Sequence, residues 1–431
     1  MNTVAAQDSR NAEIATFVSS VPPHWQTMRL SHAARLVTRK AADLDFKVGL
    51  EHIESWSGRY ISTKTTQFVG EGIAFEAGDV LFGKLRPYLA KVWVADRAGA
   101  AVGDFHVYRS SKLHSPFFKY VLLDSVFIAL VNSSTYGSKM PRASWDFIGA
   151  VKVPLPPLAE QRQIAEYLDR ETGQIDALIT KQEQLVETLA ERRQAVIAHA
   201  VTRGLDMNVE LKSSGVEWLD EIPIHWRASR LKSIARIVGR IGFRGYTTAD
   251  MVEEGDGAIA LSPSNLKDLA FDLDRCTFIS WAKYFESPEI ALEQDDILLV
   301  KTGSTVGKIA IASFPSSVAI TINPQLAVIR AMHCNPKFLL YSMSTIRIES
   351  ELRSRNAGGS IPTVTQQTIG NVVVCMPSVD EQAQIVDYLE SETHGIDALI
   401  AKADQVVEVL NERRRALITA AVTGKIDVRA F

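Results

Sequence analysis

The chain has 431 residues, a formal net charge of −3 and a hydrophobic share of 46%, which predict a soluble protein of two or more domains and by themselves favour no partner. No apolar run approaches the roughly 20 residues of a membrane-spanning helix, and residues 1–20 lack the apolar centre of a signal peptide, so we expect a cytoplasmic protein without membrane contact. The three cysteines lie far apart without a CxxC pair, which indicates a reducing compartment and no structural zinc.

A first globular part is predicted over residues 21–155, after a tail over residues 1–20 for which we expect flexibility. Its apolar runs indicate strands, short helices and a turn before a closing strand. In chain order these elements are the strands 80–82 and 92–94, helical structure over 117–130, a turn at 137–141 and a strand over 148–153. We therefore expect a compact, mixed α/β unit.

A long helix is predicted over residues 156–206. It begins after Pro156-Pro157, since prolines suit the turn before a helix, and its pattern ends at Gly204. Between these points apolar residues recur at steps of three, four or seven, which places them on one face of a helix. This stripe consists of Ile164, Leu168, Ile175, Ile179, Val186, Leu189, Val196 and Ala200.

A second globular part over residues 215–376 and a second helix over residues 377–427 repeat this plan. Corresponding strands are expected at 297–300, 309–311 and 369–374, helical structure over 336–348 and a turn at 358–362. The 47 residues that begin at Glu160 and at Glu381 align without a gap and are identical at 27 positions. The chain is therefore a tandem duplication whose helices have changed less than its globular parts.

The two long helices are expected to pair. Each has about 40 residues and would be roughly 60 Å long at 1.5 Å per residue, and a single helix of that length needs a partner to cover its apolar stripe. The predicted fold class is α/β: two α/β domains in a tandem pseudo-twofold repeat, separated by two long helices that form an antiparallel coiled coil. Either the helices keep one geometry while the globular parts recognise two different things, or coiled coils simply tolerate less change.

A second apolar line widens the stripe of each helix. It contains Leu178 and Leu185 on the first helix and their copies, Leu399 and Val406, on the second. A two-helix seam does not need this width. Two interpretations stay open: a helix of a partner protein docks on the line, or the line packs against the globular parts.

Charge is distributed unevenly along the chain. Residues 1–150 carry 17 basic and 13 acidic side chains, whereas residues 376–431 carry 6 and 10. Any nucleic-acid contact is therefore expected from local basic clusters in the globular parts. The runs Glu191–Arg193 and Glu412–Arg415 on the helices are interpreted first as solvated charge, with a phosphate contact as the alternative.

Basic residues with small polar neighbours cluster in corresponding loops of the two globular parts. Lys and Arg bind phosphates, and Arg, Ser and Thr reach base edges, although each residue taken alone is also compatible with plain surface. The candidate DNA-binding residues are Tyr60, Lys84, Arg86, Lys91, Lys139 and Arg142 in the first part, and Arg244, Tyr246, Lys301, Thr302, Ser304, Lys308, Arg353 and Ser360 in the second.

Three segments approach catalytic motifs without completing them. Gly303–Ile309 resembles a phosphate loop, but it is one residue short and lacks the Ser or Thr that holds magnesium. Phe68–Gly72 resembles the glycine loop of adenosylmethionine-dependent methyltransferases, but no helix pattern follows it directly. Asp295-Asp296 suggests a magnesium nuclease, yet no Glu-x-Lys follows, and the histidines show no metal spacing. We predict no catalytic residue, metal site or cofactor.

Three duplicated motifs together resemble the specificity subunits of type I restriction–modification systems. They are the opening Gly215–Trp226 with a shorter copy at Val21–Trp25, the acidic turn before a basic loop at Gly78–Lys84 and Asp295–Lys301, and Pro-(x)₃-Glu-Gln-(x)₂-Ile-(x)₂-Tyr-Leu at Pro156–Leu168 and Pro377–Leu389. The resemblance covers almost the whole chain after the tail. The first half departs from the pattern, since it lacks the full Gly-Val-Glu-Trp-Leu opening.

The resemblance implies that each globular part is a target recognition domain for one half of a split DNA sequence, and that the paired helices fix the gap between the half-sites. It implies double-stranded DNA, two modification (methyltransferase) subunits and two restriction (translocase and endonuclease) subunits as partners. These partners would bring adenosylmethionine and ATP, and the present chain would bind no cofactor and catalyse no reaction.

An asymmetric DNA site is expected, because the two globular parts differ in sequence. Two other classes of function stay open. One is a coiled-coil scaffold that binds proteins through its globular ends, and the other is a self-sufficient DNA methyltransferase or nuclease. DNA binding that weakens steeply with salt separates the scaffold from a DNA-binding protein.

Overall fold

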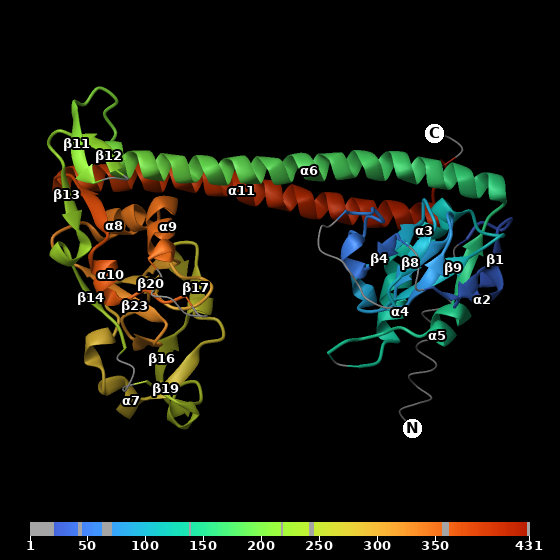
Figure 1. The fold of residues 1–431 in the computed structure, drawn as a ribbon, viewed down its shortest axis with the longest axis horizontal. Coiled ribbons are helices and arrows are strands. Elements are labelled where there is room, and N and C mark those ends of the chain that lie inside the picture. Colours follow the sequence, from blue (N-terminus) through green and yellow to red (C-terminus); the bar gives the residue numbers. More distant parts are fainter. Residues whose placement is uncertain are drawn as a thin grey trace. The chain divides into compact units, whose positions relative to one another are not determined.

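The computed structural model describes residues 21–41, 45–62, 71–137, 139–216, 219–240, 245–355 and 362–428. They form two compact units: unit 1 lies within residues 1–184 and 403–431, and unit 2 within residues 185–402. Each unit holds one globular part and a segment of both long helices, α6 (Leu158–Arg203) and α11 (Val379–Val422), as Figure 1 shows. The two units are described separately.

Unit 1 contains a four-stranded antiparallel sheet of order β2-β9-β6-β7, a four-stranded mixed sheet of order β3-β5-β8-β4, and the antiparallel pair β1-β10. The strands are β1 (Gln26–Arg29), β2 (Arg35–Val37), β3 (Lys40–Ala41), β4 (Lys47–Val48), β5 (Gly72–Phe75), β6 (Val80–Gly83), β7 (Val92–Val94), β8 (Gly99–Ala101), β9 (Phe105–Arg109) and β10 (Lys152–Leu155). The helices are α2 (Leu30–Ala33), α3 (Ser115–Leu123), α4 (Ser125–Ser133) and α5 (Trp145–Ala150).

Unit 2 repeats the topology of the antiparallel sheet, with order β14-β23-β20-β21, and has the corresponding pair β13-β24. Its mixed sheet has order β15-β19-β16-β22 and is connected differently from that of unit 1, and the pairs β11-β12 and β17-β18 are additional. The strands are β11 (Leu211–Val216), β12 (Leu219–Pro223), β13 (Arg227–Arg230), β14 (Ala235–Val238), β15 (Met251–Val252), β16 (Gly257–Leu261), β17 (Leu266–Lys267), β18 (Ala270–Phe271), β19 (Thr277–Ser280), β20 (Ile297–Val300), β21 (Ile309–Ile311), β22 (Ile320–Ile322), β23 (Leu326–Ala331) and β24 (Val373–Met376). The helices are α7 (Trp281–Phe285), α8 (Pro336–Met343), α9 (Ile346–Ser354) and α10 (Gln366–Gly370).

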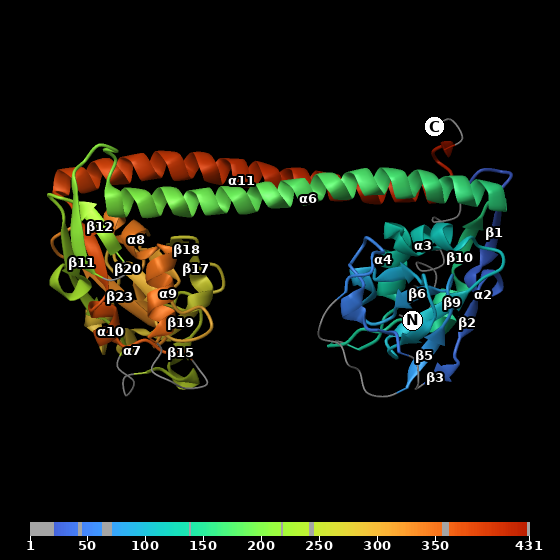
Figure 2. The ribbon, with the colours of Figure 1, turned by 45° about the horizontal axis from the view of Figure 1, so that its top comes forward.

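The central strands β6 and β20 are buried on both faces, which explains their uninterrupted apolar sequences. Val80 and Phe82 belong to the core beneath the helices, whereas Leu81 belongs to the core shared with the mixed sheet. Leu299 and Leu298 divide in the same way in unit 2. Because side chains alternate across a strand, each central strand joins a helical layer to a second sheet. In both views, α3 and α8 lie between the long helices and these strands (Figures 1 and 2).

The segments of α6 and α11 run antiparallel within each unit. In unit 1, Ile164 and Leu168 near the start of α6 share a core with Ala421 near the end of α11. In unit 2, Ala200 near the end of α6 shares a core with Ile385 near the start of α11. The fold class predicted from the sequence is thus confirmed: two mixed α/β parts with long helices that pack against each other.

A buried carboxylate–guanidinium pair fixes the acidic turn of each unit to the next strand of the sheet. The carboxylate of Asp79 accepts from Nε and Nη2 of Arg109 at 2.6 and 2.7 Å, and that of Asp296 accepts from Arg330 at 2.8 and 2.7 Å. Both carboxylates are 1% exposed. The acidic turn is therefore explained as a fold element, because a desolvated carboxylate needs such a bidentate partner.

Gln161 and Gln382 join each long helix to its globular part. Both are 1% exposed. Their carboxamide oxygens accept from the backbone N–H of His114 and Asn335, each at 2.7 Å, and their Nε2 groups donate to the carbonyl oxygen of the proline five residues earlier at 2.9 and 3.0 Å. The glutamine of the duplicated motif thus forms hydrogen bonds with buried backbone groups at the start of each long helix.

The glutamate before each of these glutamines contacts the His of the His-Trp pair that opens each globular part. His24 Nε2 lies 3.1 Å from Glu160 Oε2, and His225 Nε2 lies 3.0 Å from Glu381 Oε2. The indole N–H of Trp226 also donates to Glu381 at 3.0 Å. Two motifs that are more than 130 residues apart in sequence therefore meet in the same place in both units.

Two details of the predicted elements are wrong. The strands expected over 148–153 and 369–374 begin later, because the helices α5 and α10 occupy their first residues. The hydroxyls of Ser144 and Thr365 cap these helices by accepting from the backbone N–H three residues on, at 3.3 and 3.1 Å. The helical stretch over 117–130 is two helices, because Asp124 accepts from two backbone N–H groups at 2.9 Å and starts α4.

The interpretation of the helix arginines as solvated charge is also wrong for two of them. Arg414 is 5% exposed, and the side chain of Arg193 is 12% exposed. Their neighbours Arg192 and Arg413 are exposed, as expected. Within the described part of the chain, no single helix is long and apolar enough to cross a membrane; the bent pair α3–α4 reaches the length, and its residues fill the core of unit 1.

Candidate nucleic-acid interface

Two corresponding loops leave the central strands and begin with a lysine. Lys84 starts the loop from β6 to β7, and Lys301 starts the loop from β20 to β21. We call these two residues the frame lysines, because the same backbone hydrogen bonds hold them. The N–H of Lys84 donates to the carbonyl of Asp104 at 2.9 Å, and the N–H of Lys301 donates to the carbonyl of Gln325 at 2.8 Å.

A third segment also contacts each frame lysine, and we call the three contacting backbone segments of a unit its frame. The carbonyl oxygens of the frame lysines accept from the N–H of Ala143 and Val364, at 2.9 and 2.8 Å. The residues before these two, Arg142 and Thr363, form β-bridges with the residue after each frame lysine. Three positions, occupied by 84/104/142 in unit 1 and by 301/325/363 in unit 2, are therefore equivalent by their backbone contacts although the side chains differ at two of them.

In unit 1 the frame surrounds a recess of about 480 Å³ that is also lined by His106 and Tyr136. Arg142 Nη2 lies 3.0 Å from Asp104 Oδ1. Burial lowers the pKa of Lys84; the nearby carboxylate of Asp104 opposes this decrease, and Arg142 adds to it. The recess therefore presents two cations and one anion on a partly desolvated surface, where charge interactions are stronger than in bulk water.

His106 contributes no positive charge at neutral pH. Burial, and to a smaller extent Lys84, lowers the pKa of His106 to about 4. Its Nδ1 lies 3.1 Å from the hydroxyl of Tyr108, which is fully buried. The side chain of Tyr136 is 65% exposed at the rim of the recess and can contact a ligand.

In unit 2 the frame carries no second charge. Lys301 is half-buried, and burial lowers its pKa. The exposed Gln325 is oriented by Asn323, whose Nδ2 donates to Gln325 Oε1 at 3.1 Å and whose Oδ1 accepts from Gln325 N at 2.9 Å. An amide and the Thr363 hydroxyl thus stand where unit 1 has a carboxylate and a guanidinium, so the two frames offer different hydrogen-bonding groups beside a shared lysine.

Two of the predicted DNA-binding residues are engaged inside unit 1. Lys91 Nζ donates to the carbonyl of Leu50 at 2.7 Å. The ring of Tyr60 stacks on His52, with centroids 5.7 Å apart, and lies 5.6 Å from the ring of Trp93. Sequence pattern alone did not show these contacts, because each joins residues that the fold brings together.

Other predicted residues of unit 1 lie at the surface around the frame. Arg86 is exposed and has a left-handed backbone with φ of 51°, and its N–H donates to the carbonyl of Pro141 at 2.8 Å. Lys139 is exposed in the turn before Arg142. The loop that holds Arg86 and the turn that holds Lys139 are therefore neighbours.

In unit 2 the predicted residues after Lys301 lie in one loop. Thr302 is bridged to Thr363, Ser304 is exposed, and Lys308 is half-buried immediately before β21. Arg353 on α9 donates to the carbonyl of Ser304 at 3.3 Å.

The remaining predicted residues of unit 2 are less close to this loop in the chain. Tyr246 lies under the guanidinium of Arg240, at 5.6 Å. Arg244 and Ser360 fall outside the described residues, as does the N-terminal tail over residues 1–20.

Three side chains at frame positions were not predicted from the sequence: Asp104, Gln325 and Thr363. Nor were His106 and Tyr136, which line the recess of unit 1. None of them is a Lys or Arg, and clusters of these two residue types were the main signal used. The signal that could have found Asp104 and Gln325 is their place in the repeat, five residues before Arg109 and Arg330, which hold the two acidic turns.

The structure explains two of the three segments that approach catalytic motifs. Gly303–Ile309 connects two antiparallel strands, whereas a phosphate loop leads from a strand into a helix. Asp296 is bound to Arg330, as described above. Phe68–Gly70 lies outside the described residues. Among the residues that the structure describes, no group of three or more His, Cys, Asp or Glu side chains could hold a metal ion.

The second apolar line of the long helices is exposed in both units. Leu178 and Val406 of unit 1 are 47% and 42% exposed, and Leu185 and Leu399 of unit 2 are 44% and 51% exposed. The line therefore does not pack against the globular part of its own unit. Exposed leucines at helical spacing are characteristic of a face that another helix covers.

Comparison with known proteins agrees with the duplicated architecture. The family model of the type I restriction modification DNA specificity domain matches residues 57–188 and 284–409, which together make up more than half of the chain. The type I restriction enzyme MjaVIII specificity subunit of Methanocaldococcus jannaschii is 22% identical over 437 residues, covering 95% of this chain and 94% of that protein. The EcoBI specificity subunit of Escherichia coli is 25% identical over 380 residues, covering 85% and 78%.

A solved structure shares the fold. A chain from a study of complex assembly and conformational transition of the type I R-M system has 19% sequence identity and a TM-score of 0.71, covering 94% of this chain and 99% of that chain. At this identity the likeness establishes the fold alone. With the family match in both halves, the chain belongs to the family of the type I restriction modification DNA specificity domain and is a DNA specificity subunit.

Proposed function

We propose that the chain recognises a split, asymmetric double-stranded DNA site, one half-site for each unit. Residues 21–155 and 215–376 would be the target recognition domains, and the helices over 156–206 and 377–427 would be the spacer between them. The observation that carries the proposal is the pair of frames: the same backbone hydrogen bonds present different side chains in the two units. A symmetric site would need like side chains at the equivalent positions.

The frame lysines are proposed to bind backbone phosphates and to set the register on the duplex. Arg86 and Lys139 in unit 1 and Lys308 in unit 2 would add further phosphate contacts. The varied positions would contact base edges: a guanidinium pairs well with guanine, and the carboxamide of Gln325 pairs well with adenine. The half-site of unit 2 should therefore contain an adenine at the base that faces Gln325.

The exposed line of Leu178, Leu185, Leu399 and Val406 is proposed as the docking face for two modification subunits, with two restriction subunits joining the complex. The line occurs once in each unit, since Leu178 and Val406 lie in unit 1 and Leu185 and Leu399 lie in unit 2. Two copies of one partner can then bind in equivalent ways. Methylation, translocation and cleavage would belong to the partners, and this chain would be non-catalytic and would bind no cofactor itself.

Replacing Leu178 by lysine tests the docking face. A buried, unpaired ammonium is costly at an apolar interface, and Leu178 belongs only to the face of unit 1. We therefore expect the number of modification subunits that co-purify with each chain to fall from two to one while the variant still folds. Glu187→Lys, on the exposed opposite side of the same helix, is the control. Unchanged assembly of the Leu178 variant would exclude this face.

The main test is methylome sequencing of a host that carries this chain and its modification subunit, compared with a host that lacks the chain. We expect N6-methyladenine at one asymmetric, split motif only when the chain is present. No new methylation with both subunits expressed would favour the scaffold function. DNA affinity that is insensitive to salt would do so too, because phosphate contacts release counterions.

A further inference from the structure

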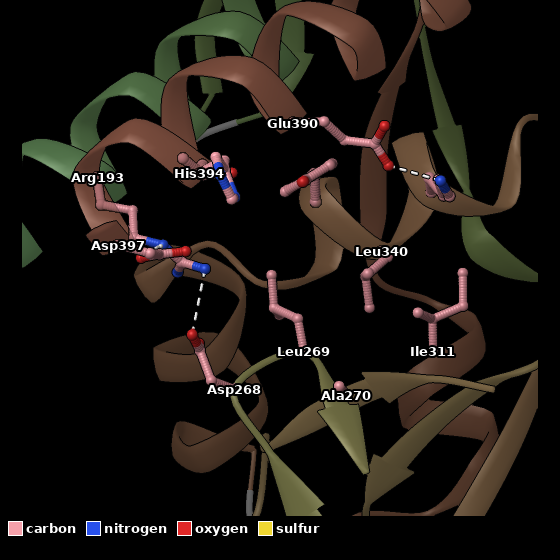
Figure 3. Close-up of a pocket in the computed structure, with 12 residues that line it drawn as sticks. Arg193, Asp268, Leu269, Ala270, Ile311, Leu340, Glu390, His394 and Asp397 are labelled. Atoms are coloured by element: carbon pink, nitrogen blue, oxygen red, sulfur yellow. Dashed lines mark hydrogen bonds and ion pairs between the residues drawn. The ribbon is translucent and has the colours of Figure 1, made fainter. Parts of the chain in front are cut away.

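One arginine of the long helices reaches the globular part in unit 2. Arg193 on α6 has Nε 2.9 Å from Asp397 Oδ1 on α11, an ion pair without the alignment of a hydrogen bond, and its Nη2 donates to Asp268 Oδ2 at 3.3 Å. Asp268 is at the tip of the β17–β18 hairpin. Figure 3 shows Arg193 between the two carboxylates, at the side of a pocket of about 310 Å³.

The copy of this arginine makes the same kind of joint in unit 1. Arg414 on α11 has Nε 3.4 Å from Asp176 Oδ1 on α6, and its Nη1 donates to the carbonyl oxygen of Trp56. Arg415 covers the ring of Trp56 at 5.2 Å. Arg193 and Arg414 occupy equivalent positions in the repeat, as do Asp176 and Asp397. Each joint therefore ties both helices to one loop tip.

The loop tips have a backbone that non-glycine residues rarely adopt. Trp56 has φ of 64°, and Asp268 and Leu269 have φ of 21° and 63°. A left-handed backbone at such residues persists only where surrounding contacts hold it. In both units an arginine of a long helix contacts the tip, and the two tips have unrelated sequences.

Each loop tip is also bonded to the hairpin that carries the frame lysine. The N–H of Trp56 donates to the carbonyl of Ala90, at the end of the loop that Lys84 begins, at 3.2 Å. The carbonyl of Leu269 accepts from the N–H of Ile311 at 2.9 Å, in the strand after the loop that Lys301 begins. A short chain of contacts thus runs from arginine to loop tip to frame hairpin in both units.

We propose that Arg193 and Arg414 are positioning residues for DNA recognition. Each locks the frame hairpin of its own unit onto the helix pair, so that the frame lysine and its neighbours meet the DNA at one fixed angle. This inference rests on the proposed function and extends it, because it assigns a role in recognition to residues that do not touch DNA. It explains why each long helix buries an arginine whose neighbouring arginine is exposed.

The salt dependence of DNA binding by the complex with the modification subunit distinguishes positioning from contact. A residue that binds one phosphate contributes about 0.9 to the slope of log affinity against log salt concentration. We expect Arg193→Met to weaken binding about tenfold at every salt concentration with an unchanged slope. Lys301→Met, in contrast, should lower the slope by about 0.9. Arg192→Met, one residue away and exposed, should alter neither quantity.

Hydrogen exchange and half-site choice give independent readouts. In Arg193→Met the amide of Ile311 should exchange at least tenfold faster, and the methylome should tolerate mismatches in the half-site of unit 2 while the other half-site stays strict. Arg193→Lys keeps the positive charge, so its exchange rate and mismatch tolerance should lie between those of the unmutated protein and of Arg193→Met. Asp268→Asn removes only the exposed partner and cannot unfold the core, so it should show the same selective relaxation in milder form.

Clear outcomes separate the inference from the proposed function. If the unmutated complex recognises a split site and the folded Arg193 variant recognises it with the same affinity and the same strictness, the positioning role is wrong and the proposed function stands. A slope that falls by about 0.9 in Arg193→Met would make it a phosphate contact, which also overturns the inference. If the unmutated complex shows no specific binding, the proposed function itself fails.

Discussion

The two units share one frame and differ in what the frame presents. Both units contain the acidic turn with its arginine partner, the glutamine that joins the long helix to the globular part, and the arginine joint of the helices, with nearly the same geometry. In contrast, Asp104 and Arg142 in unit 1 are replaced by Gln325 and Thr363 in unit 2. The backbone contacts of the frame need only N–H and carbonyl groups, so they constrain the side chains little. A duplicated fold can therefore diverge in recognition without losing its support.

The long helices show the opposite behaviour, since they have 27 identical positions in 47. Their inner stripe packs against the other helix and against the globular core, and their arginines bind loop tips. Any substitution there must satisfy several partners at once. The comparison thus separates positions that carry the structure, which are alike in both units, from the varied frame positions, which differ and which we propose to contact base edges.

Replacing the buried aspartate of an acidic turn should cause the largest loss of stability, and the loss should be similar in both units. Asp79→Ala leaves Arg109 without its buried partner, and the loss of one member of such a pair costs about 3 kcal/mol. Asp296→Ala should cost about the same. Hydrogen exchange of each unit in the full chain measures the free energy of opening. The exposed Glu76→Gln is the control and should cost less than about 1 kcal/mol. A large difference between the free energies lost in the two aspartate variants would contradict the structural equivalence of the two turns.

Acid should destabilise unit 1 through His106, for which unit 2 has Ala327 at the equivalent place. The pKa of His106 is about 4 in the folded chain and about 6.5 in the unfolded chain. As pH falls from about 6.5 to 4, the unfolded chain binds a proton that the folded chain does not, so stability is lost over this range. The loss should be on the order of 2–3 kcal/mol at most. Exchange at pH 7 and pH 5 measures it, and His106→Gln should remove most of the difference.

Replacing the glutamine that joins each long helix to its globular part should destabilise the two units by slightly different amounts. Gln161→Ala removes three hydrogen bonds, including one from its Nε2 to the carbonyl of Lys112 at 3.1 Å, and should cost about 2 kcal/mol. Gln382→Ala removes two and should cost less. Hydrogen exchange of α3 and α8 reports each loss. An equal or reversed order would show that the extra bond contributes nothing.

Exchanging the side chains at the varied frame positions should have the smallest effect on stability, and it should change the recognised half-site of one unit only. The double change Asp104→Gln with Arg142→Thr places the side chains of unit 2 on the frame of unit 1. The free energy of unfolding should change by less than about 1 kcal/mol, because the exchanged groups are partly exposed. The methylome should show a changed half-site for unit 1 alone. An unchanged motif would mean that other residues discriminate the bases.

Several predicted elements are confirmed because their signals are local. The helix stripe has a period of 3.6 residues, and the central strands are short apolar runs between turns, so neighbouring residues carry the information. The closing strands were placed too early because the capping role of Ser144 and Thr365 depends on a hydroxyl that reaches a backbone N–H, which an apolar pattern does not register.

The candidate site was predicted only in part, for a different reason. Lys84 and Lys301 were predicted because basic residues stand out at repeated positions, and Arg142 was predicted as a basic residue although its equivalent is Thr363. Asp104 and Gln325 come from another strand connection and reach the frame through backbone hydrogen bonds that no local pattern shows. Whether a basic side chain faces solvent or the interior depends in the same way on residues far along the chain.

The sequence by itself determined the duplication, the two mixed α/β parts, the pair of long helices and the family, because repeats and periodicity are properties of residue order. Only the tertiary structure decided which charges are structural. It buried Arg414 and Asp79, turned Lys91 toward the carbonyl of Leu50, and left Leu178 exposed. Burial is set by contacts between distant segments, and a charge that is desolvated must find its partner there, so these assignments cannot be made from residue type and spacing alone.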